Sequence, residues 1–379
     1  MKRRYAAILL FLLAAVPLLA QPRQWTPAEA NQWYSREPWI VGADFIPSTA
    51  SNELEMWQSD TFDPLTIDRE LGWAESLGMN SVRVFLHFLL WQRDSSGFEK
   101  RINVFLRTAD KHHIRPIFVL LDSCWDPFPE IGPQLPPKPG IHNSRWVQSP
   151  GAPILMDSKK HDQLLAYVQG MIYDYSHDKR ILAWDLWNEP GNTNPGSYGR
   201  VEPTNKVQLV TDLLPRVFQY ARAAMPSQPI TVGVWTGDWS SPDKLKPIDR
   251  LALENSDVIS FHNYGPPEDF EKRVKWLQSY GRPILCTEYM ARKAGSTFQG
   301  ILPLAKQYNV AAINWGLVAG KTQTIFAWDT WQTPATDAEP KVWFHDILRP
   351  DGRPYSVEEV AFLRTITARP EKAKAAHTK

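Results

Sequence analysis

Cysteine is almost absent from this chain of 379 residues, which contains only Cys124 and Cys286. Two thiols cannot provide the several disulfides that stabilise small exported domains, and they lack the spacing of a zinc site. We predict that both are core thiols, because the strands assigned below place them on opposite sides of a barrel. A single disulfide in an exported protein is the alternative.

Long hydrophobic segments are also scarce. The one such run, Ala6–Val16, follows three basic residues and precedes the small residue Ala20. This pattern is typical of a secretory signal peptide, and the run is shorter than the roughly 20 residues of a membrane span. We therefore predict a signal peptide over residues 1–20 and a mature protein that is secreted or periplasmic, with no membrane attachment. A retained N-terminal anchor is the alternative.

An excess of charge of either sign is missing. The formal net charge is +1, and removal of the predicted signal peptide would take away three basic residues. A nearly neutral protein gives no indication of nucleic-acid binding and suits a neutral ligand. Oligomeric state is not readable from these features.

Several catalytic motifs are absent as well. The sequence contains no Gly-x-Ser-x-Gly elbow, no P-loop, no Gly-x-Gly-x-x-Gly fingerprint and no His-Glu-x-x-His pair. His112 and His113 fall on a polar helix face, where we expect them to be solvated and not to bind a metal.

What the chain does contain is a regular alternation of short apolar runs and longer helical patterns. The candidate strands are Trp39–Ile46, Ser81–Phe88, Arg115–Leu121, Ile181–Trp187, Ile230–Trp235, Val258–His262, Pro283–Thr287 and Ala311–Trp315. The candidate helices are Leu65–Leu77, Arg101–His112, His161–Tyr175, Val207–Ala224, a weak one around Leu251–Leu253, Phe270–Tyr280, Phe298–Tyr308 and Val357–Ile366. Eight such units predict an α/β fold, a (β/α)8 TIM barrel forming one catalytic domain over residues 21–368, followed by a disordered basic tail at 369–379. An open doubly wound sheet shares the local pattern and is the alternative.

Long connections follow three of the candidate strands, at Trp125–Asp157, Gly191–Lys206 and Lys321–Tyr355. Loops at the carboxyl ends of barrel strands carry function. The first is rich in proline, which favours a defined loop wall over a mobile linker.

The strongest local signal is the aromatic strand that ends in Asn188-Glu189-Pro190. Proline cannot continue the strand, so Glu189 is left at its mouth. Burial against aromatic neighbours would raise the pKa of this carboxyl, as a general acid requires. A turn carboxylate without catalytic function is the alternative.

A second carboxylate lies in the run that continues the seventh candidate strand. Ile284, Cys286 and Glu288 share one side of it by the two-residue strand period, so Glu288 is predicted to point into the barrel mouth. A buried carboxylate is costly unless it is bonded or used, and the alternative role is that of a structural partner for an arginine. Two carboxyl groups roughly 5–5.5 Å apart are what a retaining glycosidase needs.

These features resemble the clan of retaining glycosidases that carry the acid/base on strand four and the nucleophile on strand seven, and most of all glycoside hydrolase family 5. The resemblance covers residues 39–320 and implies that Glu189 is the acid/base and Glu288 the nucleophile. Further matches imply a substrate-binding set. It consists of Asn188, which would bond the sugar 2-hydroxyl, His262 and Tyr264 on strand six, Arg83 on strand two, and Trp315 as the sugar platform. Taken singly, Arg83 could be an ion-pair residue, Trp315 a core aromatic and His262 a buried histidine.

One position departs from the family pattern, because no histidine ends the third strand. The chain instead carries Asp122 and Trp125 there, and we expect either to occupy the space beside the scissile sugar. The chain also has 17 tryptophans, whose faces can stack on pyranose rings. We expect about half of the six at predicted strand ends to line a cleft; these are Trp91, Trp125, Trp235, Trp239, Trp328 and Trp331.

The resulting prediction is a glycoside hydrolase that cleaves a β-linked polysaccharide or oligosaccharide of cellulose, mannan or xylan type by double displacement. It requires no metal and no organic cofactor. The alternatives are a transglycosylase that uses the same site and a catalytically silent carbohydrate-binding barrel.

Overall fold

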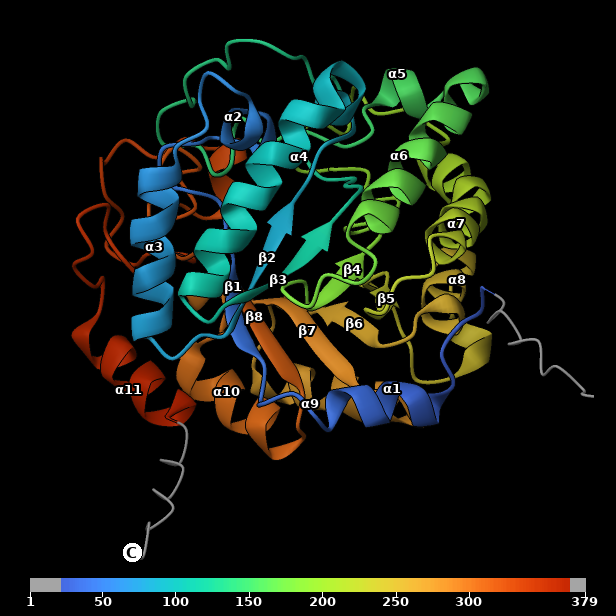
Figure 1. The fold of residues 1–379 in the computed structure, drawn as a ribbon. Helices are drawn as coiled ribbons and strands as arrows, with labels where there is room; N and C mark the ends of the chain where they lie inside the picture. Colours follow the sequence, from blue (N-terminus) through green and yellow to red (C-terminus); the bar gives the residue numbers. More distant parts are fainter. Residues whose placement is uncertain (1–21, 369–379) are drawn as a thin grey trace, which may run out of the picture.

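The computed structural model describes residues 22–368, so the predicted signal peptide and the predicted tail lie outside the described residues. Eight parallel strands form one sheet in the order β5-β4-β3-β2-β1-β8-β7-β6 (Figure 1). The strands are β1 (Val41–Asp44), β2 (Ser81–Phe85), β3 (Arg115–Val119), β4 (Ala183–Asp185), β5 (Ile230–Thr231), β6 (Ile259–His262), β7 (Ile284–Tyr289) and β8 (Ala311–Trp315). A parallel bridge between Val234 and Phe261 joins the segment after β5 to β6 and closes the ring. The predicted (β/α)8 barrel is confirmed, and the open sheet is wrong.

Helices surround the strands on the outside of the barrel (Figure 1). Those that alternate with the strands are α3 (Pro64–Ser76), α4 (Phe88–Lys111), α6 (His161–Asp174), α7 (Lys206–Ala223), α8 (Pro247–Asn255), α9 (Pro267–Leu277), α10 (Phe298–Gln307) and α11 (Val357–Thr367). Each corresponds to a predicted helix. Helix α4, which corresponds to the predicted helix Arg101–His112, begins earlier than predicted, at Phe88. Non-helical torsion angles at Asp94 mark a kink inside it.

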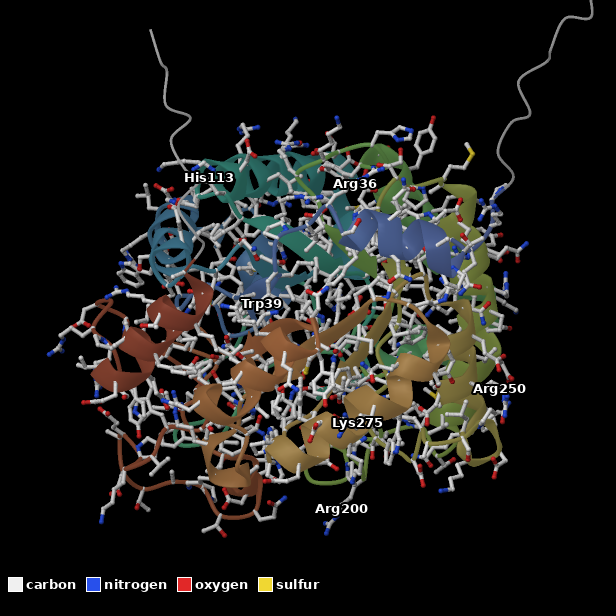
Figure 2. The ribbon with its side chains drawn as sticks, turned by 90° about the horizontal axis from the view of Figure 1, so that it is seen from below. Arg36, Trp39, His113, Arg200, Arg250 and Lys275 are labelled. Atoms are coloured by element: carbon white, nitrogen blue, oxygen red, sulfur yellow. The ribbon has the colours of Figure 1, made fainter. Side chains whose placement is uncertain are left out.

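Three short helices were not predicted: α1 (Pro27–Tyr34), α2 (Glu53–Trp57) and α5 (Ala152–Leu155). Helix α1 begins at a capping box in which Thr26 and Glu29 bond each other's backbone amides. Its buried residues Ala30 and Tyr34 pack on apolar side chains from the amino ends of the strands. The view from below shows α1 lying across this end of the barrel, next to Trp39 (Figure 2). The amino end is thereby sealed, and the carboxyl end is left for the site.

The three long loops meet above the carboxyl ends of the strands. The amide of His142 donates to Thr330 Oγ1 at 3.0 Å, and Trp331 Nε1 donates to the His142 carbonyl at 2.8 Å. The Gln332 side chain reaches the Gly196 carbonyl in the loop after β4. These bonds fix the loops as one wall of the site.

Both cysteines are buried free thiols, as predicted. Within residues 22–368, no helix combines the length and the apolar character that crossing a membrane requires.

Candidate functional site

Two glutamates meet at the carboxyl end of the barrel. Glu189 follows β4, and its left-handed backbone (φ 42°) turns the chain sharply at that point. Glu288 lies in β7, where a register shift between Cys286 and Tyr289 bends the strand. One carboxyl oxygen from each glutamate and one nitrogen of His262 all lie within 4.8 Å of one another. The two carboxyl groups, far apart in the sequence, are therefore direct neighbours across the mouth.

Arg83 on β2 is fully buried beneath them and connects four acidic or amide side chains. Its Nη1 donates to Glu288 Oε1 and to Asp44 Oδ1, both at 2.9 Å. Its Nη2 donates to Asp185 Oδ2 at 2.8 Å and to Asn188 Oδ1 at 2.7 Å. One positive charge therefore faces three carboxyl groups. Burial and the neighbouring acids raise the pKa of Asp44 well above its usual range.

Glu288 is held by donors on both oxygens. Besides the bond from Arg83, Tyr264 Oη donates to its Oε2 at 2.7 Å, and His262 Nδ1 lies 3.4 Å from the same oxygen. Burial raises the pKa of Glu288, while His262 and Arg83 act in the opposite direction. This arrangement stabilises a carboxylate that is aimed at the cleft.

Glu189 has a different environment, in which no lysine or arginine of residues 22–368 forms an ion pair with it. Its Oε1 lies 2.9 Å from His262 Nδ1, while its Oε2 accepts bonds from Asn192 Nδ2 at 2.6 Å and from the Cys124 thiol at 3.2 Å. Burial raises the pKa of Glu189 and lowers that of His262 to about 4. Glu189 is thus placed to hold a proton closer to neutral pH than an exposed glutamate does.

Asp122 lies behind the cleft and not in it. Its side chain accepts bonds from Asn188 Nδ2 at 2.9 Å and from Trp146 Nε1 at 2.7 Å. Burial raises its pKa to about 6. Asp122 is placed to orient Asn188 and Trp146 and does not line the cleft.

The two glutamates open into a cleft of about 510 Å³, within the usual range of ligand sites. Among the residues predicted from sequence, Asn188, Tyr264, Trp315 and Trp125 line it with the glutamates, whereas Arg83, His262 and Asp122 lie behind it. Its six tryptophans are Trp125, Trp146, Trp235, Trp315, Trp328 and Trp331.

Four of the six tryptophans expected at strand ends line the cleft. Trp239 is instead buried with 2% exposure, and Trp91 packs against Tyr167. Trp146 also lines the cleft and was not identified from the sequence. Its ring lies 5.4 Å, centroid to centroid, from that of Trp315. Trp125 stacks on Trp331 at 5.5 Å, which joins two of the long loops through their aromatic rings.

Several further polar residues of the cleft lie in loops and were not predicted, among them His142, His345, Asn192 and Asn194. Loops have no periodicity that would show which side chains point inward, so no sequence pattern marked these positions. His142 nevertheless belongs to the loop after β3, the strand that lacks the histidine typical of the family.

Glu189, His262 and Glu288 form the only group of three metal-ligating side chains close enough to share an ion within residues 22–368. Arg83 Nη1 lies 2.9 Å from Glu288 Oε1, so the guanidinium would repel a cation bound by this carboxyl group. The hydrogen bonds of this group suit proton transfer better than metal binding.

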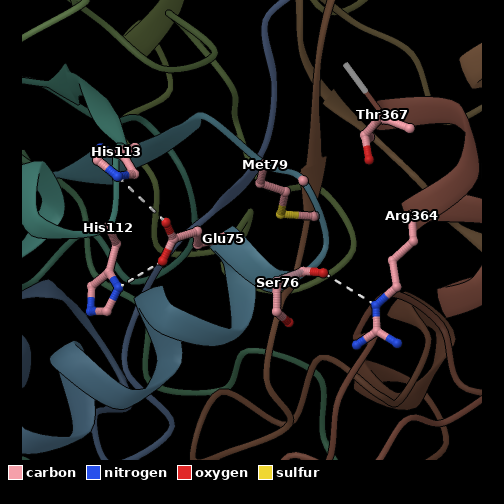
Figure 3. Close-up of a pocket in the computed structure, with 9 residues that line it drawn as sticks. Glu75, Ser76, Met79, His112, His113, Arg364 and Thr367 are labelled. Carbon is pink, nitrogen blue, oxygen red and sulfur yellow. Dashed lines mark hydrogen bonds and ion pairs between the residues drawn. The ribbon is translucent and has the colours of Figure 1, made fainter. Parts of the chain in front are cut away.

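A second hollow lies at the opposite end of the barrel, between the ends of α3, α4 and α11 (Figure 3). His112 in it is bonded by Asp68 at 2.7 Å and by Glu75 at 3.1 Å, whereas the His113 side chain is 81% exposed. His113 is therefore solvated as expected, but His112 is hydrogen-bonded to two carboxyl groups and has only 13% of its side chain exposed.

Comparison with known proteins gives both a family and a fold. Residues 140–331 match the cellulase family, glycosyl hydrolase family 5. No curated protein matches the chain by sequence. A GH5_18 protein from Streptomyces cattleya in complex with Manb1-4GlcNAc superposes with a TM-score of 0.58 at 14% identity, covering 86% of this chain and 79% of that one.

Two further structures share the fold. The exo-beta-1,4-mannosidase Op5Man5 from Opitutaceae bacterium strain TAV5 gives a TM-score of 0.57 at 16% identity, covering 86% of this chain and 59% of that one. The endo-beta-1,4-mannanase from Thermotoga petrophila gives 0.54 at 16% identity, covering 88% of this chain and 77% of that one.

Proposed function

This chain belongs to the cellulase family, glycosyl hydrolase family 5, and from that premise we propose that it hydrolyses β-linked glycans with retention of anomeric configuration. The observation that carries the proposal is the approach of Glu189 and Glu288, each of which has an oxygen within 4.8 Å of the other. Retaining enzymes place their carboxyl groups roughly 5–5.5 Å apart, and inverting enzymes leave roughly 6.5–9.5 Å for a water molecule. The close pair favours direct attack by one carboxylate.

In the first step, Glu288 attacks the anomeric carbon and Glu189 protonates the departing glycosidic oxygen. Arg83 and Tyr264 each donate a hydrogen bond to Glu288, which keeps it ionised and fixes its direction. The raised pKa of Glu189, caused by burial, keeps the proton available for the leaving group. The C–O bond to the aglycone breaks as the bond to Glu288 forms.

In the second step, Glu189 acts as a base. It removes a proton from water, which attacks the anomeric carbon and releases Glu288 as a carboxylate. His262 contacts both glutamates through Nδ1. It is uncharged near neutral pH, because burial lowers its pKa to about 4. Its role is to keep the two carboxyl groups in fixed relative positions while Glu189 changes from acid to base.

Asn188 and Trp315 complete the sugar site. The Asn188 amide is oriented by Arg83 on its oxygen and by Asp122 on its nitrogen, and it lines the cleft beside Glu189. We assign it to the hydroxyl next to the anomeric carbon. Trp315 at the end of β8 lines the same cleft and offers an aromatic face to the sugar ring.

Among cellulose, mannan and xylan types, we favour a β-mannan or a β-mannoside-containing oligosaccharide as the substrate. The support is that the structural neighbours include an exo-mannosidase, an endo-mannanase and a protein bound to Manb1-4GlcNAc. The basic and apolar start of the sequence supports export of the mature protein.

The experiment begins with a screen of the purified protein on mannan, cellulose, xylan and aryl β-glycosides. A 2-deoxy-2-fluoroglycosyl fluoride of the preferred sugar should then attach covalently to Glu288, as peptide mass spectrometry would show. Glu189→Ala should hydrolyse aryl glycosides with good leaving groups far better than natural substrates, and azide should restore turnover. Label on any other residue, or undiminished hydrolysis by Glu288→Ala, would refute the mechanism.

A further inference from the structure

Two buried histidines from different loops face each other in the wall of the cleft. His142 lies in the loop after β3, and His345 lies in the loop after β8. Their ring centroids are 5.3 Å apart, and both rings line the cleft that holds Glu189 and Glu288. His345 also lies 5.5 Å, centroid to centroid, from Tyr264, whose hydroxyl donates to Glu288. The pair therefore borders the sugar that Glu288 would attack.

The backbone fixes which nitrogen of each ring carries the hydrogen. His142 Nδ1 lies 2.8 Å from the Phe326 carbonyl, and His345 Nδ1 contacts the Met290 carbonyl. A carbonyl oxygen can only accept a hydrogen bond, so Nδ1 must be the donor in both rings. In the neutral imidazole, Nε2 then carries a lone pair and can only accept.

The surroundings keep both rings neutral. His142 packs against Trp125, Trp328 and Phe344, and His345 packs against Phe344, Trp328 and Tyr264. Burial lowers the pKa of His142 to about 4 and that of His345 well below its usual range, and the proximity of the two rings adds to the effect at His345.

Neither Nε2 has a hydrogen-bond partner among the side chains and backbone groups of residues 22–368. Two lone pairs in an aromatic wall are thus left for a ligand.

We propose that His142 and His345 form a paired hydrogen-bond acceptor that binds hydroxyl groups of a neutral sugar beside Glu288. The inference deepens the proposed function and rests on it, because it specifies which sugar chemistry the same site admits. Sugar hydroxyls can donate to both nitrogens. A uronic acid carboxylate at that position can only accept, so it would place negative charge against two lone pairs in a site of low polarity. The pair would therefore select hydroxyl-bearing glycosides against their uronic acid counterparts.

Substitutions can separate the two ring nitrogens of each histidine. In His142→Asn and His345→Asn, the amide NH2 can still donate to the backbone carbonyl, but no acceptor remains at the position of Nε2. In His142→Gln and His345→Gln, an amide oxygen can take the place of Nε2. We expect each Asn variant to lower kcat/KM on the preferred glycoside by about 3- to 10-fold, the range of one lost neutral hydrogen bond, and each Gln variant to recover part of that loss.

Substrate analogues identify the partner. For at least one hydroxyl of the sugar, the deoxy analogue should lower kcat/KM in the wild type but cause no further loss in the Asn variant that lacks its acceptor. His113→Phe, on the exposed histidine at the far end of the barrel, is the control and should match the wild type. Circular dichroism and thermal melting would show that the variants fold.

The two proposals fail in different ways. A folded wild type that hydrolyses no glycoside overturns the proposed function and this inference together. An active wild type whose Asn variants keep full kcat/KM, or whose losses are independent of every deoxy substitution, overturns only the histidine pair. Nitrogen-15 NMR should find both imidazoles with hydrogen on Nδ1, and hydrogen on Nε2 would equally contradict the proposal.

Discussion

Arg83 Nη1 lies 2.9 Å from Glu288 Oε1 and 2.9 Å from Asp44 Oδ1, so one nitrogen of the guanidinium donates to two carboxyl groups. Asp44 is itself 5% exposed, and its Oδ2 has no hydrogen-bond partner within residues 22–368. Any negative charge on Asp44 therefore competes with Glu288 for the same cation. We therefore expect the acidity of the proposed nucleophile to depend on a residue of β1 that does not line the cleft.

Replacing Asp44 by Asn should lower the pKa of Glu288. The variant keeps an oxygen that can accept from Arg83 but removes the competing ionisable group. Because Glu288 must be ionised to attack, activity is lost as the pH falls through its pKa, so the acidic limb of the kcat/KM profile should move to lower pH by about half a unit to one unit. Asp162→Asn, on an exposed aspartate, is the control. A limb that stays in place would show that Asp44 does not act on Glu288.

Replacing Arg83 by Lys should reduce kcat by about 100-fold or more, with a smaller change in KM. Lysine keeps the charge but cannot reproduce the planar fork that bonds Asp44, Asp185 and Glu288 at once. Arg115→Lys is the matched control, because Arg115 pairs with Glu37 at the amino end of β3. Steady-state kinetics would measure both variants. A rise in KM with unchanged kcat would mean that Arg83 contributes to substrate binding and not to the attack by Glu288.

Replacing Cys124 by Ala should raise the pKa of Glu189. The thiol donates to Glu189 Oε2 at 3.2 Å, and this bond favours the ionised carboxylate. Glu189 must be protonated in the first step, so activity is lost as the pH rises through its pKa. The basic limb of the kcat/KM profile should therefore move to higher pH in the variant, by a few tenths of a unit to about one unit.

Cys286→Ala is the matched control for this shift. Cys286 is also buried, but its thiol contacts the backbone oxygen of Glu288 and not a carboxyl group. Its variant should lose some stability and leave the basic limb unchanged. Equal shifts in both variants would mean that the effect comes from packing.

The barrel and the positions of the two glutamates at strand ends could be predicted from the sequence, because both depend on short-range patterns. Strand alternation marked all eight strands, and the break at Pro190 left Glu189 at the end of a strand. The cleft wall was less accessible to sequence reasoning. His142 and His345 are brought together by loop contacts such as the bond between the His142 amide and Thr330, and no periodicity encodes those contacts. Asp122 was expected beside the scissile sugar, but it lies behind Asn188, and that placement depends on packing that only the structure shows.

Glu53, outside the cleft, supports a prediction about stability. It is 1% exposed at the start of α2, and neither of its carboxyl oxygens accepts a hydrogen bond from a side chain of residues 22–368. Burial raises its pKa well above the ordinary value of 4.5, so Glu53 is neutral in the folded protein over a wide pH range. The unfolded chain releases this proton as the pH rises above 4.5, and the folded protein does not.

This difference in bound protons destabilises the wild type progressively above that pH, until Glu53 also ionises in the folded state. Glu53→Gln has no proton to release, so its free energy of unfolding should exceed that of the wild type by about 1–3 kcal/mol at pH 8, and the two should converge near pH 4. Denaturant titrations at several pH values would measure this. Glu254→Gln, on an exposed side chain, should follow the wild type throughout. A Glu53→Gln variant that is less stable than the wild type at pH 8 would mean that the carboxyl group is ionised and used by the fold.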